Sequence, residues 1–413
     1  MAAPPTTILN AWERSHTLPS SSVDRIWGAH VFRGRARGVI AVAGALAAGF
    51  AAISGPASAA GAAADSTAPG VAAGYSHTCA IDLDGALSCW GGNYSGQLGD
   101  GTRTSRTTPV RVGDGSWTAV EAGTSYTCAI RTGGTLWCWG SNTQGQLGDG
   151  STTSRTTPVP VGEAATWTSV SAGDNHTCAV RTDETLWCWG SNRFGQLGVP
   201  DVANARTPAQ VGTAADWATV ATGYAHTCGT RTDGTLWCWG DAMFGQLGLG
   251  TPLSYRAVPA QVGTETTWAG VAAGYAFSCA VRTDGTLWCW GENGYGQLGV
   301  SGGQRAAPVQ VGDDTSWAGL NAGFDTVCAT RTDGSLWCWG NNTVGQLADG
   351  TTTHRNAPVR IGDDTTWTND TAVGYHNCAF RTDGSLWCWG NNANAQLGDG
   401  TTTARPVPQQ VDL

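Results

Sequence analysis

The chain of 413 residues contains no lysine, so all 22 basic residues are arginine, a bias that we attribute to codon usage. Acidic residues number 31, and the formal net charge is −9. A chain of this charge does not attract polyanionic nucleic acid or an anionic membrane through bulk charge. The composition therefore predicts neither a nucleic-acid partner nor, once a leader has been removed, a membrane partner.

Several chemical motifs are also missing. The sequence has no GxSxG, HExxH or phosphate-loop string, and no CxxC pair of the kind that binds zinc. We therefore predict no catalytic residue, no metal and no cofactor, although an active site built on two carboxylates stays open. No segment keeps a period of 3.6 residues, so helix should be scarce.

The amino-terminal region is typical of a secretory leader. Arg33, Arg35 and Arg37 precede an apolar run at residues 38–53, and small residues follow it. The run is short for a membrane span of about 20 residues, which makes a membrane anchor the alternative. We predict a signal peptide with an extended n-region at 1–59, a short linker at 60–70, and a secreted or envelope location. Translation from Val31 would explain the long n-region.

Cysteine marks an internal repeat. The 14 cysteines form seven pairs, the members of each pair lie ten positions apart, and the pairs recur about every fifty residues. Behind a leader, such an even set favours disulfides over metal sites. The predicted pairs are Cys79 with Cys89, Cys128 with Cys138, Cys178 with Cys188, Cys228 with Cys238, Cys279 with Cys289, Cys328 with Cys338, and Cys378 with Cys388.

Each repeat contains four short apolar runs bounded by Gly, Asp, Asn and Pro, which predict four strands, A to D. Four strands per fifty residues are typical of a β-propeller blade. The first copy begins with strand A and the last ends with strand D, so we predict that the ends close a ring; an open solenoid is the alternative. The predicted fold is all-β, a seven-bladed β-propeller at 71–413 with four antiparallel strands per blade.

The hairpin between strands B and C predicts the disulfides. A three-residue turn such as Thr232-Asp233-Gly234 sets the two cysteines of a blade directly opposite each other. Seven bridges within the blades follow, each contributing about 2–3 kcal/mol. Reduced thiol pairs are the alternative. The regularly repeated tryptophans are predicted to pack between neighbouring blades.

The string GYAHTC at 223–228, with RTDGTLWCWG at 231–240 and GQLG at 245–248, resembles the repeat of the regulator of chromosome condensation family. All seven copies carry these elements, with departures at Ala348 and Ala395. The resemblance implies a seven-bladed propeller and extends over most of the chain. Paired cysteines are similar to those of bacterial envelope members of the family.

The family's functions are diverse. Its eukaryotic founder exchanges nucleotide on a nuclear GTPase and docks on nucleosomes, using a basic tail and a wedge that are absent here. The plant UV-B receptor uses Trp in its GWRHT loops, whereas these loops lack Trp here, as in GYSHT at 74–78. Secreted members that cover the mouth of a β-lactamase are the closer functional analogue.

Positions that vary among the copies are candidates for recognition. In an antiparallel blade the A–B and C–D loops share one face, on which arginines and acids balance; the B–C and D–A face is acidic. Aromatic residues and Met are enriched at interfaces. We predict a binding arc on blades three to five, against the alternative that these are blade caps and scattered surface residues. The candidates are Tyr75, Phe194, Tyr224, Met243, Phe244, Tyr275, Tyr295, Phe324 and Tyr375.

Four histidines precede the first cysteine of their repeats, at His77, His176, His226 and His376. A metal is one interpretation, but Tyr, Phe or Thr replaces His in the other copies, which favours a structural hydrogen bond. The acid pairs at 313–314 and 363–364 are candidates for weak calcium binding.

The function predicted is a monomeric propeller that binds a protein partner, for example an extracellular enzyme that it inhibits. A carbohydrate- or wall-acting protein is the alternative, and nucleotide exchange ranks third.

Overall fold

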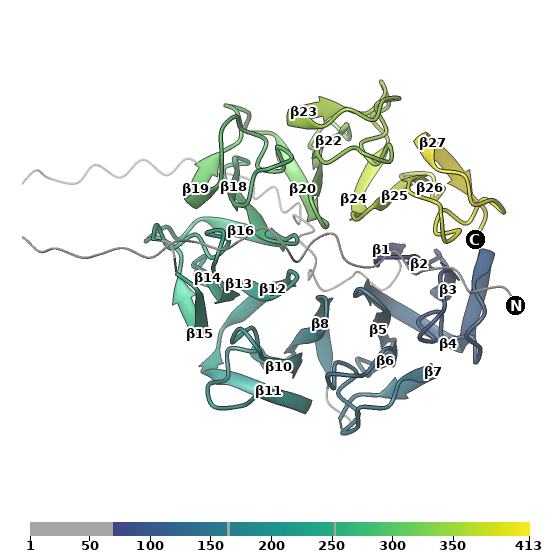
Figure 1. The fold of residues 1–413 in the computed structure, drawn as a ribbon, viewed down its shortest axis with the longest axis horizontal. Coiled ribbons are helices and arrows are strands. Elements are labelled where there is room, and N and C mark those ends of the chain that lie inside the picture. Colours follow the sequence, from purple (N-terminus) through teal and green to yellow (C-terminus); the bar gives the residue numbers. More distant parts are fainter. Residues whose placement is uncertain (1–68, 163–165, 252) are drawn as a thin grey trace, which may run out of the picture. The chain divides into compact units, whose positions relative to one another are not determined.

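The computed structural model describes residues 69–162, 166–251 and 253–413. The predicted signal peptide and nearly all of the predicted linker lie outside these residues. The described chain forms strands and turns without helix, as predicted, and it offers no helical segment suited to crossing a membrane. Its strands form seven four-stranded antiparallel units arranged around a centre (Figure 1).

The blades follow the chain in order, and each runs from the inner strand A to the outer strand D. Blade 1 consists of β1 (Gly70–Ala73), β2 (His77–Ile81), β3 (Ala86–Gly91) and the start of β4 (Arg106–Ala122). Blade 2 consists of the end of β4, β5 (Tyr126–Arg131), β6 (Leu136–Gly140) and β7 (Arg155–Pro160). Because β4 serves both blades, they share one continuous sheet.

The other five blades repeat this order. Blade 3 consists of β8 (Trp167–Ala172), β9 (His176–Arg181), β10 (Thr185–Ser191) and β11 (Asn204–Ala215), and blade 4 of β12 (Trp217–Thr222), β13 (His226–Arg231), β14 (Leu236–Asp241) and β15 (Tyr255–Gln261). Blade 5 consists of β16 (Trp268–Ala273), β17 (Phe277–Arg282), β18 (Leu287–Gly291) and β19 (Arg305–Gln310). Blade 6 consists of β20 (Trp317–Ala322), β21 (Thr326–Arg331), β22 (Leu336–Gly340) and β23 (Arg355–Arg360), and blade 7 of β24 (Trp367–Ala372), β25 (His376–Arg381), β26 (Leu386–Gly390) and β27 (Arg405–Val411).

All seven predicted disulfides are present, which excludes the alternative of reduced thiol pairs in this structure. In each blade the two cysteines are direct cross-strand partners, with Cα atoms 4.0–4.2 Å apart. This spacing is that of a pair without backbone hydrogen bonds, where side chains come closest. No free cysteine occurs among the described residues. The bridges join Cys79 to Cys89, Cys128 to Cys138, Cys178 to Cys188, Cys228 to Cys238, Cys279 to Cys289, Cys328 to Cys338, and Cys378 to Cys388.

The turn that was predicted to set these cysteines opposite each other is also confirmed. Arg231 N–H donates to the Thr235 carbonyl across residues 232–234, and Gly234 has φ +78°. A left-handed φ of this kind favours glycine, which the sequence supplies at the third turn position. The short turn therefore defines the register of strands B and C.

One hydrogen-bonded motif joins successive blades. The second Trp of strand C is fully buried, and its indole N–H donates to the carbonyl of the Gln in the GQLG turn of the preceding blade. Thr127 donates to the same carbonyl, that of Gln97, as Trp139 does, at 2.8 and 2.9 Å. The Trp bond recurs at all seven interfaces, so these tryptophans pack between blades as predicted.

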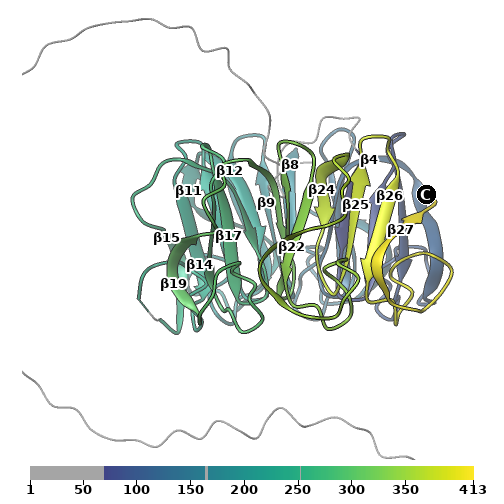
Figure 2. The ribbon, with the colours of Figure 1, turned by 90° about the horizontal axis from the view of Figure 1, so that it is seen from above.

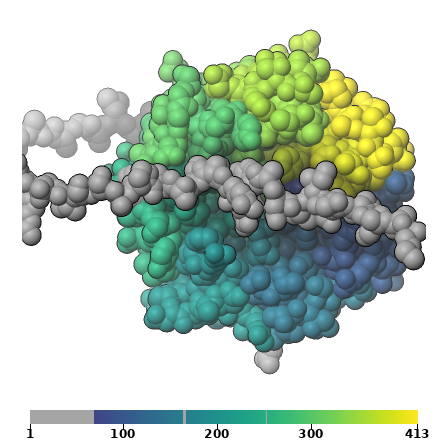
Figure 3. All heavy atoms as spheres, viewed as in Figure 1, coloured from purple at the N-terminus to yellow at the C-terminus, as the bar shows by residue number. Residues whose placement is uncertain are grey.

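The ring closes with the same motif. Trp90 and Thr78 of blade 1 donate to the Gln396 carbonyl of blade 7, at 2.9 and 2.7 Å. Strand β1 also packs against β24 and β25. In the space-filling view the yellow last blade lies beside the blue first blade (Figure 3), and seen from the side the blades stand next to one another (Figure 2). The two ends of the described chain therefore meet, which confirms the ring and excludes an open solenoid.

The first Trp of strand C behaves differently from the prediction of interblade packing. It is only partly buried, and an Arg at the end of strand B lies between it and the strand A Trp of the same blade. In blade 4 the Arg231 guanidinium lies 4.9 Å from the Trp217 ring and 4.2 Å from the Trp237 ring. Six blades carry this cation–π arrangement, which occupies the arginines of the B–C face.

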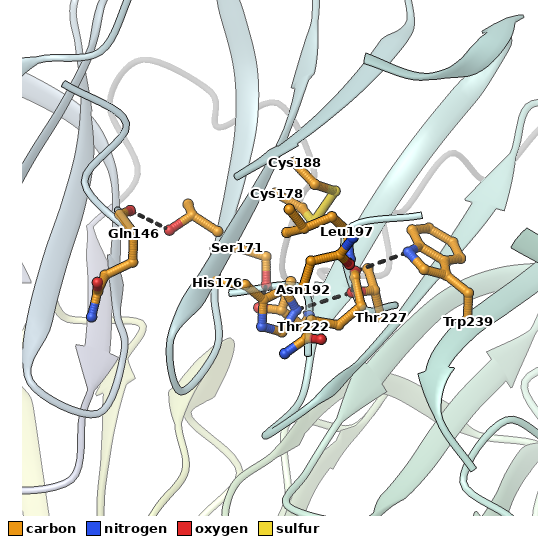
Figure 4. Close-up of a disulfide and its surroundings, with 12 residues drawn as sticks. Gln146, Ser171, His176, Cys178, Cys188, Asn192, Leu197, Thr222, Thr227 and Trp239 are labelled. Atoms are coloured by element: carbon orange, nitrogen blue, oxygen red, sulfur yellow. Dashed lines mark hydrogen bonds between the residues drawn. A yellow bond between two sulfur atoms is a disulfide. The ribbon is translucent and has the colours of Figure 1, made fainter. Parts of the chain in front are cut away.

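The four histidines are structural, as the hydrogen-bond interpretation predicted. Each is fully buried, and its Nε2 lies within hydrogen-bond distance of a hydroxyl on the next blade, as in His226 to Ser278 Oγ at 2.9 Å. Figure 4 shows His176 in this setting, beside the Cys178–Cys188 disulfide and Thr227. Burial lowers the pKa of His176 to about 3 and that of His226 to about 4, so the rings are neutral.

Candidate functional site

The two loop sets that were predicted to share a face are joined directly. In each blade the backbone N–H that opens the C–D loop donates to a carbonyl of the A–B turn, as in Asp241 N–H to Ala225 O at 2.9 Å. At the opposite end the D–A segment bonds to the B–C turn, as in Trp167 N–H to Gly134 O. The molecule therefore has an A–B/C–D face and a B–C/D–A face, and all nine candidate residues belong to the first.

The candidates of the A–B turns converge across blades. Tyr224 contacts Tyr275 with ring centroids 4.3 Å apart, and Phe324 stacks on Tyr375 at 4.7 Å. Tyr75 meets Phe324 and Tyr375 edge-on, each at 5.5 Å. Tyr275 and Phe324, 6.5 Å apart, link the two groups. We call these five residues the aromatic crescent. They are more than caps on single blades, because they touch one another over blades 4, 5, 6, 7 and 1.

The crescent lies at the mouth of a central channel. Strand A residues of all seven blades line this channel, whose volume is about 150 Å³. Four crescent residues line it as well: Tyr75, Tyr224, Tyr275 and Phe324. The three tyrosines remain 39–48 % exposed although they pack together, so their outer surfaces are open to a ligand.

The candidates of the C–D loops lie further out. Phe194 is half-buried in a groove of about 630 Å³ that Arg193 and Asn204 also line. Asp174 and Tyr224 line both this groove and the central channel, so the two depressions meet. The Phe194 side of the predicted arc is therefore continuous with the crescent.

The remaining C–D candidates lie on the next two blades. Met243 is strongly exposed, and its neighbour Phe244 is half-buried. Tyr295 is exposed and contacts His354 of blade 6 edge-on, with centroids 5.1 Å apart. The arc thus consists of separate apolar side chains at successive blades, and the structure brings only Phe194 next to the crescent.

Each repeat carries one arginine at or near the start of strand D, and the seven are Arg106, Arg155, Arg206, Arg256, Arg305, Arg355 and Arg405. This set divides into two groups. In blades 1, 2, 6 and 7 the Arg binds an Asp of the same C–D loop, as in Arg155 to Asp149 at 2.7 Å. That Asp also accepts from an Asn that fastens the GQLG turn, Asn142 in this blade. Blades 3 to 5 lack the Asp, and Arg206 and Arg256 are exposed without an ion pair among the described residues.

Arg305 of blade 5 instead donates to carbonyls of its own loop, including that of Ser301 at 3.1 Å, so Arg206 and Arg256 are the exposed members of this set. Blade 4 adds large exposed apolar residues that sequence reasoning missed, Leu253, Tyr255 and Val258. Their signal was available, because the Asp-Gly step of the C–D loop is missing from the same three copies that carry aromatics before GQLG. Tyr94, on the C–D loop of blade 1, is a further exposed ring on this face that was missed.

Several acidic side chains on or near this face have a raised pKa. Burial raises the pKa of Asp174, and burial together with the nearby Glu292 charge raises the pKa of Asp325 to about 6. Glu121, on the channel wall, has its pKa raised to about 8 by burial. Glu121 was not among the sequence candidates, although the other repeats place small or amide residues there. These acids and the crescent together form the candidate site.

Metal binding gains no support from the geometry. Within residues 69–162, 166–251 and 253–413 no three His, Cys, Asp or Glu side chains gather as metal ligands do. The proposed calcium ligands Asp314 and Asp364 instead form ion pairs with Arg331 and Arg381, each at 2.7 Å. The acidic B–C face is therefore partly neutralised by its own arginines.

The fold and face define a disulfide-stapled seven-bladed propeller. The RCC1-like domain model matches residues 53–269 and 163–413, so the chain belongs to the RCC1-like domain family. No curated protein sequence matches it significantly. Among solved structures, yeast RCC1 (Prp20), solved with Kap60, superposes with a TM-score of 0.72 at 20 % identity, over 81 % of this chain and 85 % of Prp20. Human WBSCR16 superposes with a TM-score of 0.71 at 21 % identity, over 79 % and 94 %. These similarities concern the fold.

Proposed function

We propose that the protein is a secreted or envelope-attached binding module that recognises a protein partner with its A–B/C–D face. The observation that carries this proposal is the aromatic crescent, which joins the Phe194 groove at Asp174 and Tyr224. The same face also carries exposed arginine, Met and aromatic side chains on blades 3 to 5, and such residues are enriched at protein-binding surfaces.

Two further observations support this reading. Seven buried disulfides suit an oxidising compartment, which favours export. Yeast Prp20, with the same fold, was solved with Kap60, and its binding to Gsp1p and histones has been characterised, so this propeller architecture serves protein recognition elsewhere. A face with a central apolar cluster also fits inhibition of an extracellular enzyme by covering its active site.

The test is partner capture with the oxidised protein from the extracellular and envelope fractions of the producing cell. Phe194, Phe244 and Tyr295 are changed together to Ser, with Leu83→Ser on the B–C face and Val407→Ser on outer strand β27 as the control. We expect the triple variant to lose capture and the control to retain it. A captured enzyme is then assayed for inhibition. Unaltered capture by the triple variant would refute the arc.

A second candidate rests on one pair of acids. Glu292 and Asp325 both contact the side-chain amide of Gln297, and the other blades do not repeat this pair. The pKa of Asp325, which burial and the nearby Glu292 charge raise to about 6, suits general acid catalysis on a glycoside. Hydrolysis of wall polysaccharide that Asp325→Asn abolishes would favour this carbohydrate-acting function.

A further inference from the structure

The channel mouth combines aromatic rings with carboxylates in a fixed order. The residue after the strand A glycine occupies one ring position in every blade. Blades 4 to 7 and blade 1 place the aromatic crescent there, while blades 2 and 3 place Thr124 and Asp174. The aromatic side chains therefore leave a gap in the ring at blades 2 and 3, and the side chain of Asp174 occupies this gap.

The wall of the channel below the mouth is also acidic. The charged side chains that line it are Glu121 and Asp174, and both are acidic. Polar side chains elsewhere in the wall are paired, since Ser171 bonds Thr222 at 2.9 Å and Asn321 donates to Thr371 at 2.8 Å. Glu121 has no hydrogen-bond partner among the described residues and borders the channel.

An ionised carboxylate without a partner is costly in such a channel, so Glu121 keeps its proton while the channel is empty. A cation brought beside it would remove that cost and allow it to ionise. Aromatic faces attract cations through their quadrupole, and aromatic cages with nearby acids are a recurring way to hold an ammonium group. A cavity of about 150 Å³ can hold a benzene-sized group. The alkyl stem of an amine is narrower than benzene, so the cavity has room for it.

We propose that the channel mouth is a socket for a primary ammonium group on an aliphatic stem, of the kind a lysine side chain presents, with its charge between the aromatic crescent and the carboxylates of Asp174 and Glu121. The socket itself rests on the channel geometry. The identification of its occupant as a side chain of the partner rests on the proposed function.

The test titrates n-butylammonium chloride into the purified oxidised protein at constant ionic strength, followed by NMR or calorimetry, with 1-butanol as the neutral isostere. We expect saturable binding of the amine and at least about tenfold weaker binding of the alcohol. Asp174→Asn and Glu121→Gln should each weaken amine binding about tenfold. Asp84→Asn, which removes the same charge from an exposed B–C turn, should leave it unchanged.

Thermal melts are used to check that each variant is folded. Phe324→Leu is a second variant, which removes one aromatic ring of the crescent without changing the charge. Equal affinity for amine and alcohol, or amine binding that Asp174→Asn and Glu121→Gln both leave intact, would overturn the socket. If a partner is captured but the amine does not bind, the socket is wrong and the binding function stands. If the amine binds but no partner is captured, the partner assignment fails while the socket stands.

Discussion

Replacement of one buried His–Ser pair by an apolar pair should reduce, by a measurable amount, the free energy of unfolding that the protein loses in acid. His226 contacts Ser278 on the next blade, whereas at the following interface Phe277 and Val327 occupy the two corresponding positions, and both are buried. The polar pair and the apolar pair are alternative solutions for one interface. The double variant His226→Phe with Ser278→Val therefore transfers a pair that the chain already uses.

The magnitude follows from proton binding. Unfolded histidine has a pKa of 6.5, while burial lowers the pKa of folded His226 to about 4. Between these values the unfolded chain binds a proton that the folded chain does not, so stability is intact above pH 6.5 and falls as the pH drops. At pH 5 the loss from this residue is about 2 kcal/mol.

The assay is urea unfolding with intact disulfides, followed by Trp fluorescence at pH 7.5 and pH 5. Wild type should lose about 2 kcal/mol more than the double variant over this interval. Every other titrating group, including the acids whose pKa is raised, is common to both proteins and cancels. Ser278→Val alone keeps the imidazole and should keep the steep dependence. Parallel pH profiles for wild type and the double variant would refute a neutral buried His226.

Three further outcomes are expected. Ala348 and Ala395 have φ of +57° and +62° where other copies have Gly, so Ala348→Gly and Ala395→Gly should each raise the free energy of unfolding by about 1 kcal/mol in urea melts. Replacing both Cys228 and Cys238 by Ala should lower it by about 2–3 kcal/mol; no change relative to oxidised wild type would contradict the bridge. Glu121 stays protonated in the folded chain up to a pKa of about 8, so its stabilising contribution is lost as the pH rises. Glu121→Gln should therefore gain stability over wild type between pH 5 and pH 8, by at most about 1.4 kcal/mol per pH unit, and identical profiles would show an unshifted carboxyl.

Much of the blade could be predicted because its determinants are local. The ten-residue spacing of Cys228 and Cys238 and the turn with Gly234 define the hairpin register within a few residues. Strand order and the shared face of the A–B and C–D loops follow from antiparallel connection. Such features depend on neighbours in sequence, and a repeat shows them seven times.

Features that cross the ring could not be read in this way. Comparison of the copies shows that Tyr75 and Phe324 occupy equivalent positions, but not that their rings are 5.5 Å apart, because that distance depends on the width of the channel. The stacking of Arg231 between two tryptophans was missed for another reason. Strand periodicity places residues on a face without giving the reach of a long side chain.

All blades share the same buried features, whereas their C–D loops differ, and this difference has a physical basis. Every interface keeps the Gln–Trp hydrogen bond, and every blade keeps its disulfide, so these buried features hold the ring together. The Asp–Arg pairs of the C–D loops, such as Asp149 with Arg155, are partly exposed, and pairs of this kind contribute about 0–1 kcal/mol each. Their loss from blades 3 to 5 therefore costs little stability. It leaves Arg206 and Arg256 without acidic partners beside exposed aromatic side chains, and the surface best suited to recognition lies where the fold depends least on its loops.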